Sequence, residues 1–184
     1  YNGVFTGVPE NGTISVALAT VNGGVNLIGN PYPSPISIPA FFAGNSDLEE
    51  TIYYWRKRNG AAGTGYATYN AMGFVSVQPG LTDLGATIES QPLISSGQGF
   101  FVKSTGASSL QFNNSMRRLT SNGAFLRSNP TEKHRFWLNL STASGTVGQT
   151  LIGYIAGGTA GVDNGFDSSY FDDSPVALTS LLNG

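Results

Sequence analysis

The sequence predicts an all-β protein, an antiparallel β-sandwich of jelly-roll kind with at most one or two short helical turns. Short runs of β-branched and aromatic residues alternate with clusters of Gly, Asn, Pro and Ser, which typically bound strands. No segment keeps a 3.6-residue apolar period over four turns, so long amphipathic helices are not expected. Several short strands with turn-rich spacers favour a sandwich or a barrel.

The expected strands follow one another along the chain. Two runs alternate clearly, and the residues expected on one face are Ile14, Val16 and Leu18 in residues 13–18, and Phe136, Leu138 and Leu140 in residues 135–140. The other expected strands are residues 25–28, 51–55, 73–77, 98–103, 109–112, 151–155 and 175–182.

Two segments between these strands have a definite local prediction. Residues 37–42 suit a helical turn, with Ser37 as the N-cap and Pro39 inside the first turn. Residues 29–35 contain three prolines, which fix φ and remove three backbone donors. This segment is either a binding loop that presents Tyr32 or a fixed corner between sheets, and the corner is the preferred interpretation.

Composition limits the domain organisation and the partners. A chain of 184 residues suits one core, so residues 1–184 are expected to form a single β-sandwich domain or most of one. Apolar residues make up 40%, which argues against disorder. Charged residues make up only 11%, against roughly 25% in an average soluble domain, so Ser, Thr, Asn, Gln and 25 glycines must supply the polar surface. This pattern is common in extracellular β proteins, whose tight turns need Gly and Asn.

The sequence also argues against nucleic-acid binding, cysteine-based sites and a transmembrane segment. The net charge is −2 with nine basic residues spread thinly, so nucleic acid is not an expected partner. There is no cysteine, which excludes disulfides, thiolate metal sites and cysteine nucleophiles. No apolar run reaches about 18 residues, so no transmembrane segment is expected.

Five stretches in this order resemble a region of very large secreted proteins of Bacteroidota such as flavobacteria. They are residues 26–34, 52–55, 96–103, 112–117 and 135–140, and residues 153–154 and 163–167 fit the later part of the same pattern. The resemblance covers roughly residues 5–182. In those proteins the region lies near the C-terminal end, ahead of a type IX secretion sorting domain. The resemblance implies an exported β-sandwich region, outside a Gram-negative cell or on its outer surface, with no known reaction.

The sequence therefore predicts a non-catalytic structural or adhesive module of an exported protein, a type IX secretion substrate. Its expected partners are other domains of the same polypeptide and secretion or surface components. Strand-like residues 175–182 lead into Asn183-Gly184, a turn dipeptide that normally precedes another strand. We therefore expect the native polypeptide to continue, or a partner to cover this edge.

The sequence shows little sign of catalysis. His134 is the only histidine and stands between Lys133 and Arg135, and no G-x-S-x-G motif is present. A carboxylate pair for glycoside hydrolysis could be drawn from Asp163, Asp167, Asp172 and Asp173. These residues lie in one Gly-rich loop, whereas such pairs usually flank a cleft from separate strands. The chain is therefore not expected to be an enzyme.

A carbohydrate-binding module is the alternative function. Sugars stack their C–H faces on aromatic rings, and polar neighbours bind the hydroxyls. Within an expected strand, Tyr53 and Trp55 share one face. Packing of Trp55 and Trp137 in the core is the competing interpretation. The ligand-binding residues on this hypothesis are Tyr53, Trp55, Tyr66 and Tyr69.

Calcium is the metal that best suits the ligands offered by the acidic loop. The candidate residues are Asp163, Asn164, Asp167, Asp172 and Asp173. Hard oxygen ligands on a flexible loop suit Ca²⁺, although the spacing does not match an EF-hand. The competing interpretation is a solvated turn whose side chains cap the backbone. Arg117 is either an ion-pair partner of Asp163 or Asp167, or a solvated side chain.

Overall fold

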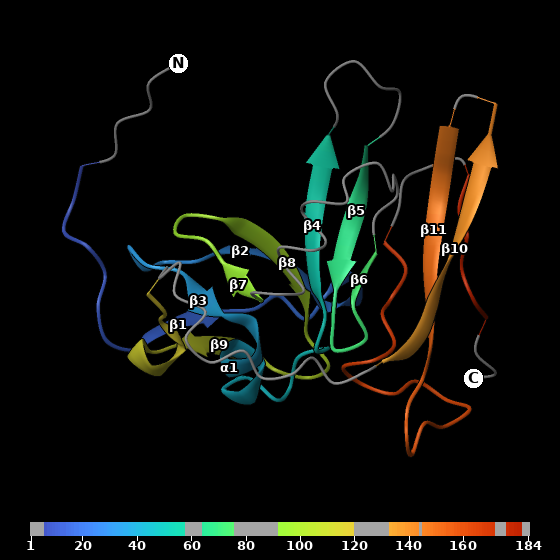
Figure 1. Ribbon diagram of the computed structural model, residues 1–184. Helices are drawn as coiled ribbons and strands as arrows, with labels where there is room; N and C mark the ends of the chain where they lie inside the picture. Colours follow the sequence, from blue (N-terminus) through green and yellow to red (C-terminus); the bar gives the residue numbers. More distant parts are fainter. Residues whose placement is uncertain are drawn as a thin grey trace.

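The computed structural model describes residues 6–57, 64–75, 92–119, 133–143, 145–171 and 176–181 (Figure 1). Its largest sheet has five antiparallel strands in the order β2-β8-β4-β5-β6. These strands are β2 (Val25–Gly29), β8 (Gly99–Lys103), β4 (Ile52–Lys57), β5 (Thr64–Tyr69) and β6 (Phe74–Val75).

A second layer covers one face of this sheet. It contains two short antiparallel ribbons and one short helix, with 3₁₀ turns in two of the connections. The ribbons are β1 (Ile14–Ala17) with β9 (Ser109–Phe112) and β3 (Ile36–Ser37) with β7 (Leu93–Ile94); the helix is α1 (Ile38–Ala43), and the 3₁₀ turns are η1 (Asn22–Gly24) and η2 (Asn114–Met116). The layered, antiparallel arrangement with one short helix confirms the all-β prediction.

The core lies between the two layers. Alternate residues of the strands enter it, and in β9 Leu110 and Phe112 are buried while their neighbours are exposed. The ring of Phe41 in α1 packs on Phe112 and on Phe100 of β8, with ring centroids 5.5 and 5.6 Å apart. Leu18 is buried at the end of β1, on the face that the alternation of residues 13–18 predicts.

The predicted helix start is confirmed. Ser37 is extended and its hydroxyl accepts a hydrogen bond from the backbone N–H of Ala40 at 3.4 Å, while a proline occupies the first turn. The helix is short because Gly44 ends it after six residues. Its buried residues, among them Phe41 and Phe42, anchor the second layer on the sheet.

The proline-rich segment is a fixed corner. Tyr32 is 1% exposed, and its hydroxyl donates to the backbone oxygen of Gly12 at 2.5 Å. Asn30 is buried beside it, and its amide donates to three backbone oxygens, those of residues 34, 94 and 95. A buried ring does not present itself to a ligand, so the geometry supports the corner interpretation over the binding loop.

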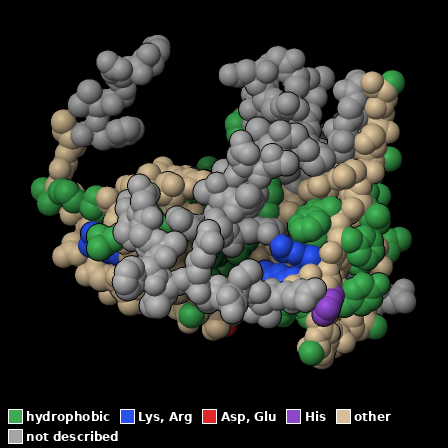
Figure 2. Space-filling view, in the orientation of Figure 1, with side chains coloured by type: hydrophobic (Ala, Val, Ile, Leu, Met, Phe, Trp, Pro, Cys, Tyr) green, Lys and Arg blue, Asp and Glu red, His purple; other side chains and the backbone are tan. Residues whose placement is uncertain are grey.

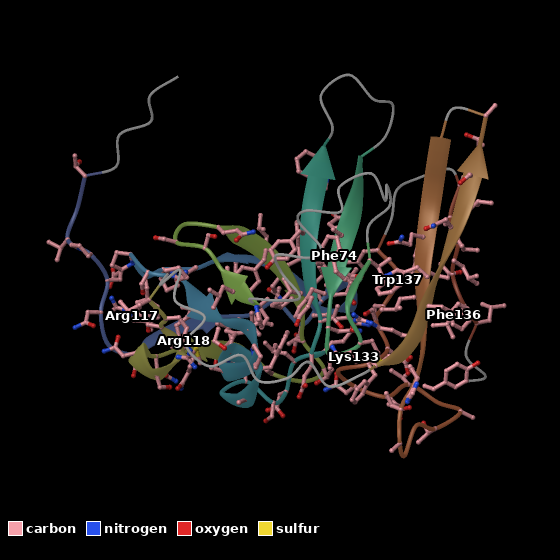
Figure 3. All side chains as sticks on the ribbon, viewed as in Figure 1. Phe74, Arg117, Arg118, Lys133, Phe136 and Trp137 are labelled. Atoms are coloured by element: carbon pink, nitrogen blue, oxygen red, sulfur yellow. The ribbon has the colours of Figure 1, made fainter. Side chains whose placement is uncertain are left out.

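A long hairpin stands beside the free edge of β6. It consists of β10 (His134–Thr142) and β11 (Gly145–Tyr154). The indole N–H of Trp137 donates to the backbone oxygen of Phe74 at 3.0 Å, and Figure 3 shows Trp137 pointing toward β6 while Phe136 points away. Hydrophobic side chains gather over the hairpin (Figure 2). Leu138 of β10 is 43% exposed. The predicted face of Phe136 and Leu138 exists, but it does not enter the core.

Two predictions about individual segments are wrong. Residues 176–181 form no strand, although residues 175–182 were expected to. Trp55 is 53% exposed, so the expected packing of this tryptophan in the core does not occur. Among the described residues, no helix is long and apolar enough to cross a membrane.

Candidate functional site

Aromatic side chains from three strands share the outer face of the five-stranded sheet. Tyr53 of β4 is paired with Phe101 of β8, and Trp55 lies directly opposite Tyr66 of β5. Directly opposed residues point to the same face, and the rings of Tyr66 and Phe101 pack edge to face at 5.5 Å. Three of the four expected ligand-binding residues are thus brought together, whereas Tyr69 lies on the opposite face, in the core.

Phe171 decides which of these rings a ligand can reach. It comes from the irregular segment after β11 and stacks on Tyr53, with centroids 4.2 Å apart and planes 25° apart. Tyr53 is therefore fully buried. Trp55 stays exposed farther along the same face, and Tyr66 is partly buried.

A buried carboxylate fastens the segment that carries Phe171. Glu49, just before β4, is 7% exposed. Its carboxylate accepts hydrogen bonds from the hydroxyl of Tyr53, from the backbone N–H of Ser169 at 2.9 Å and from the Ser169 hydroxyl at 2.7 Å. The ammonium of Lys103 lies 3.4 Å from the same carboxylate and donates to the Ser169 hydroxyl at 2.6 Å. A buried charge is tolerated when it is paired and hydrogen-bonded in this way.

Within the described part of the chain, the hydroxyls of the adjacent residues Tyr53 and Tyr54 in β4 differ: the first is hydrogen-bonded and the second is not. Burial, and then the adjacent Glu49 carboxylate, raise the pKa of Tyr53 well above its usual value. Burial also raises the pKa of Tyr54, which faces the core. The Tyr54 hydroxyl is buried and has no hydrogen-bond partner among the residues that the structure describes.

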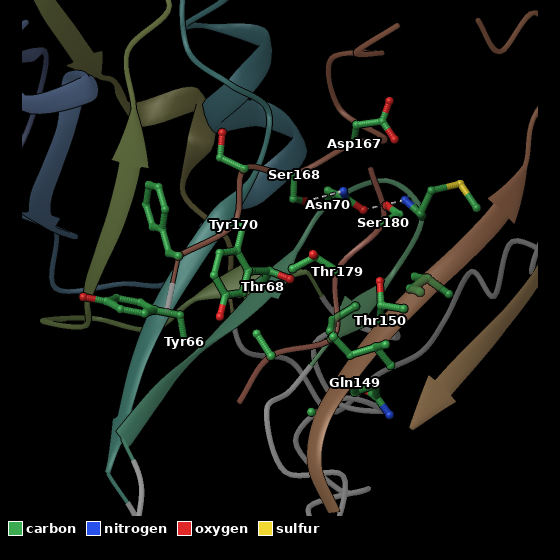
Figure 4. A pocket seen from close by; sticks show the side chains of 18 of the residues that line it. Tyr66, Thr68, Asn70, Gln149, Thr150, Asp167, Ser168, Tyr170, Thr179 and Ser180 are labelled. Carbon is green, nitrogen blue, oxygen red and sulfur yellow. Dashed lines mark hydrogen bonds between the residues drawn. The ribbon is translucent and has the colours of Figure 1, made fainter. Parts of the chain in front are cut away.

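A groove opens next to the aromatic face (Figure 4). Its volume is about 250 Å³, and it runs between β5, β6, β11 and the segments 166–171 and 177–180. Threonine and serine hydroxyls line it from several sides, with tyrosine and phenylalanine rings at its wall. The lining hydroxyl residues include Thr68, Thr150, Thr179 and Ser180, and the rings include Tyr66 and Tyr170.

Asn70 holds the wall of the groove in place. Its amide donates to the backbone oxygen of Phe166 at 2.7 Å and to the Ser168 hydroxyl at 2.9 Å. Its carbonyl accepts from the backbone N–H groups of Met72 and Gly73 at 2.9 and 3.3 Å. The side chain therefore ties segment 166–171 to the turn between β5 and β6.

The acidic loop lies at the other end of the same segment. The Asp163 carboxylate accepts from the backbone N–H and the hydroxyl of Thr159, at 2.7 and 2.8 Å. Asp167 accepts from the backbone N–H of Asp163 at 2.7 Å, and Asn164 accepts from the backbone N–H of Glu50 at 2.9 Å. These contacts are those of the capped-turn interpretation.

The other members of the calcium prediction fall outside the described residues. They are Asp172 and Asp173, so the structure places only Asp163, Asn164 and Asp167 of that set. Within the described ranges, no three His, Cys, Asp or Glu residues are grouped so that they could hold a metal ion.

Arg117 has other partners than those predicted. Its guanidinium donates to the hydroxyl of Ser34 at 2.9 Å and to the side chain of Asn11 at 3.1 Å, and it lies over the Tyr32 ring, 5.3 Å from the centroid. Figure 3 shows it at the β1–β9 end of the molecule, away from the hairpin. The predicted pairing with Asp163 or Asp167 is wrong, and Arg117 instead fastens the proline corner. His134 is exposed at the start of β10.

Sequence reasoning missed the buried charge and the cover over Tyr53. The sequence analysis did not single out Glu49. The adjacent acidic residues Glu49 and Glu50 are an unusual pair in a chain with so few charges, and this pair was the available signal. Segment 166–171 contains Phe166, Tyr170 and Phe171, and so many rings in a loop indicate that the loop packs on the protein. Strand β5 was missed because Gly65 and Ala67 weaken its β signal.

Comparison with known proteins places the chain in a family. Over residues 1–184 it matches the model of a domain of unknown function, DUF8693. The chain belongs to this family. No curated protein matches it, and no solved structure matches it either. Membership brings no activity, ligand or partner with it, so the functional argument rests on the geometry.

Proposed function

We propose that this DUF8693 chain is a non-catalytic structural and adhesive module of an exported bacterial protein. The observation that carries the proposal is that charged side chains hold irregular segments of the chain against the rest of the protein. Glu49 and Lys103 hold segment 163–171 on the sheet, and Arg117 holds the corner at residues 29–35. Both fastened segments are irregular, so these contacts give rigidity where no strand ladder supplies it.

The same contacts favour a structural role over a catalytic one. An acid or base in catalysis must reach a substrate proton within hydrogen-bond distance. Glu49 is 7% exposed and already accepts hydrogen bonds from two side chains and one backbone N–H. Asp163 and Asp167 accept from backbone groups of their own loop.

Export through the type IX route rests on the sequence. The low charge and the glycine-rich turns are common in extracellular β proteins, and the five ordered stretches resemble the secreted proteins of Bacteroidota. Such a module needs to keep its shape outside the cell, and two sets of fasteners between distant segments serve that need. Its expected partners are other domains of the same polypeptide and components of the cell surface.

The location is tested by labelling intact cells of a type IX-competent Bacteroidota strain that expresses the chain within its native polypeptide. We expect external protease and antibody to reach the module, and to lose access in a strain without the type IX machinery. Retention inside the competent cells overturns the proposed location.

Adhesion is tested with beads that carry the folded chain. We expect such beads to bind producing cells, and beads with the heat-unfolded chain not to bind. His134→Ala is the control, since a module without catalysis keeps its adhesion when its only histidine is removed. Adhesion no greater than that of beads coated with an unrelated β protein refutes the adhesive role.

A further inference from the structure

We propose that the groove between β5, β11 and segment 166–171 is a binding site for a neutral oligosaccharide, extended along the sheet by Trp55. This inference deepens the proposed adhesive function and rests on it, because it names the chemical class of ligand and the residues that contact it.

Unpaired hydroxyls are the first support. Thr68, Thr150, Thr179 and Ser180 come from three separate segments and line the same groove (Figure 4). None of these four side chains makes a hydrogen bond to another described residue. Each hydroxyl offers one donor and two acceptor lone pairs, so the groove presents several uncommitted polar groups at fixed places. A ligand with many hydroxyls can use such an array.

Charge narrows the ligand class. The described residues that line the groove include no Lys, Arg or His, and their one charged side chain is Asp167. One oxygen of this carboxylate already accepts the backbone N–H of Asp163 at 2.7 Å. Phosphate and carboxylate ligands are held by cationic side chains or by backbone N–H groups at helix starts. The lining therefore suits a neutral ligand.

Rings supply the apolar part of the site. Tyr66 and Tyr170 line the groove, and Tyr66 is braced by Phe171 at 5.9 Å between centroids. Trp55 lies directly across the β4–β5 pair from Tyr66 and is 53% exposed. Sugar rings stack on aromatic faces. An oligosaccharide whose first units lie in the groove can therefore stack a later unit on Trp55, just outside the groove.

Size and rigidity agree with this occupant. A volume of about 250 Å³ lies just below the roughly 300–1,000 Å³ of pockets for drug-sized ligands, which suits one or two sugar rings and leaves the remaining units on the surface. The four hydrogen bonds of Asn70 fix the groove wall before any ligand binds. A wall that is already ordered lowers the entropy lost on binding.

The test measures binding of the folded 184-residue chain by titration calorimetry. The neutral probes are cellohexaose, xylohexaose, mannohexaose and laminarihexaose, each with its disaccharide, and hexagalacturonate is the anionic probe. We expect saturable binding of at least one neutral hexasaccharide and none of hexagalacturonate. Binding of the anionic probe alone, or of no probe, overturns the inference.

Two variants and their controls locate the site. Thr150→Val removes one lining hydroxyl at nearly constant shape and should weaken binding about 2- to 10-fold, whereas Thr105→Val, at an exposed threonine outside the groove, should not. Trp55→Ala should remove most of the advantage of the hexasaccharide over the disaccharide, with Tyr154→Ala, 70% exposed on β11, as its control. Equal effects of a variant and its control place the ligand elsewhere and refute the site. If sugar binding fails while the coated beads still adhere, this inference falls and the proposed function stands.

Discussion

The two adjacent tyrosines of β4 should respond in opposite ways to the same chemical change. Tyr54→Phe removes a hydroxyl that is buried without a partner, which costs about 1–3 kcal/mol in the folded state. The lost oxygen leaves a cavity of about 10–15 Å³, which takes back only about 0.3 kcal/mol at roughly 24 cal/mol per Å³. We expect the variant to be more stable than the parent by about 0.7–2.7 kcal/mol.

Tyr53→Phe is the matched control. It removes the hydroxyl that donates to the buried Glu49 carboxylate. A hydrogen bond to a charged group contributes about 1.5–3 kcal/mol, and its loss leaves Glu49 with Ser169 and Lys103 alone. We expect this variant to be less stable by that amount.

Urea unfolding measures both changes. With a slope near 2 kcal/mol per molar urea, each 1 kcal/mol moves the midpoint by about 0.5 M, so the two variants should shift it in opposite directions. A Tyr54→Phe variant that is less stable than the parent shows that its hydroxyl has a partner in solution and refutes the argument.

Three further predictions concern pH, backbone geometry and the contacts of Arg117. The pKa values of Tyr53 and Tyr54 are higher in the folded protein than in the unfolded chain. The free energy of unfolding should therefore be constant up to about pH 10 and fall above it, by up to about 1.4 kcal/mol per pH unit for each tyrosine. A melting temperature that stays constant from pH 10 to about pH 12 contradicts this. Gly24→Ala should destabilise the protein by about 2–4 kcal/mol, because φ is +73° and a backbone oxygen lies 2.7 Å from the new Cβ. Gly12→Ala is the control: φ is also positive but no atom lies near the new Cβ, so the same urea assay should show a loss of about 1 kcal/mol. Arg117→Lys should cost about 1–2 kcal/mol, because one ammonium cannot replace the planar guanidinium that contacts Ser34, Asn11 and the Tyr32 ring; melting equal to the parent refutes the role of Arg117 as a fastener.

Local signals predicted most of the secondary structure. The alternation in residues 13–18 and 109–112 identifies β1 and β9, and Ser37 with Pro39 identifies the start of α1. Such patterns are readable because a side chain's face and a cap depend on residues only two or three positions away. Weak or very short strands such as β3 and β7, two residues each, carry no such signal and were missed.

The sequence likewise predicted only part of the candidate site. The sequence indicated that Tyr53 and Trp55 share a face and that Tyr66 belongs with them, and the pairing of β4 with β5 and β8 brings them together. It did not indicate the groove, because the groove's hydroxyls come from β5, β11 and segment 177–180, which are distant in the chain.

By itself the sequence determined an all-β chain with few charges, rigid turns and a strand rich in aromatic residues. Only the tertiary structure decided that Tyr53 is buried while Trp55, on the same face, is exposed. The cause is Phe171, which stacks on Tyr53 because Glu49 binds Ser169 from 120 residues away. No periodicity encodes a contact of that separation, since it forms only where folding brings a buried carboxylate and a distant loop to the same place.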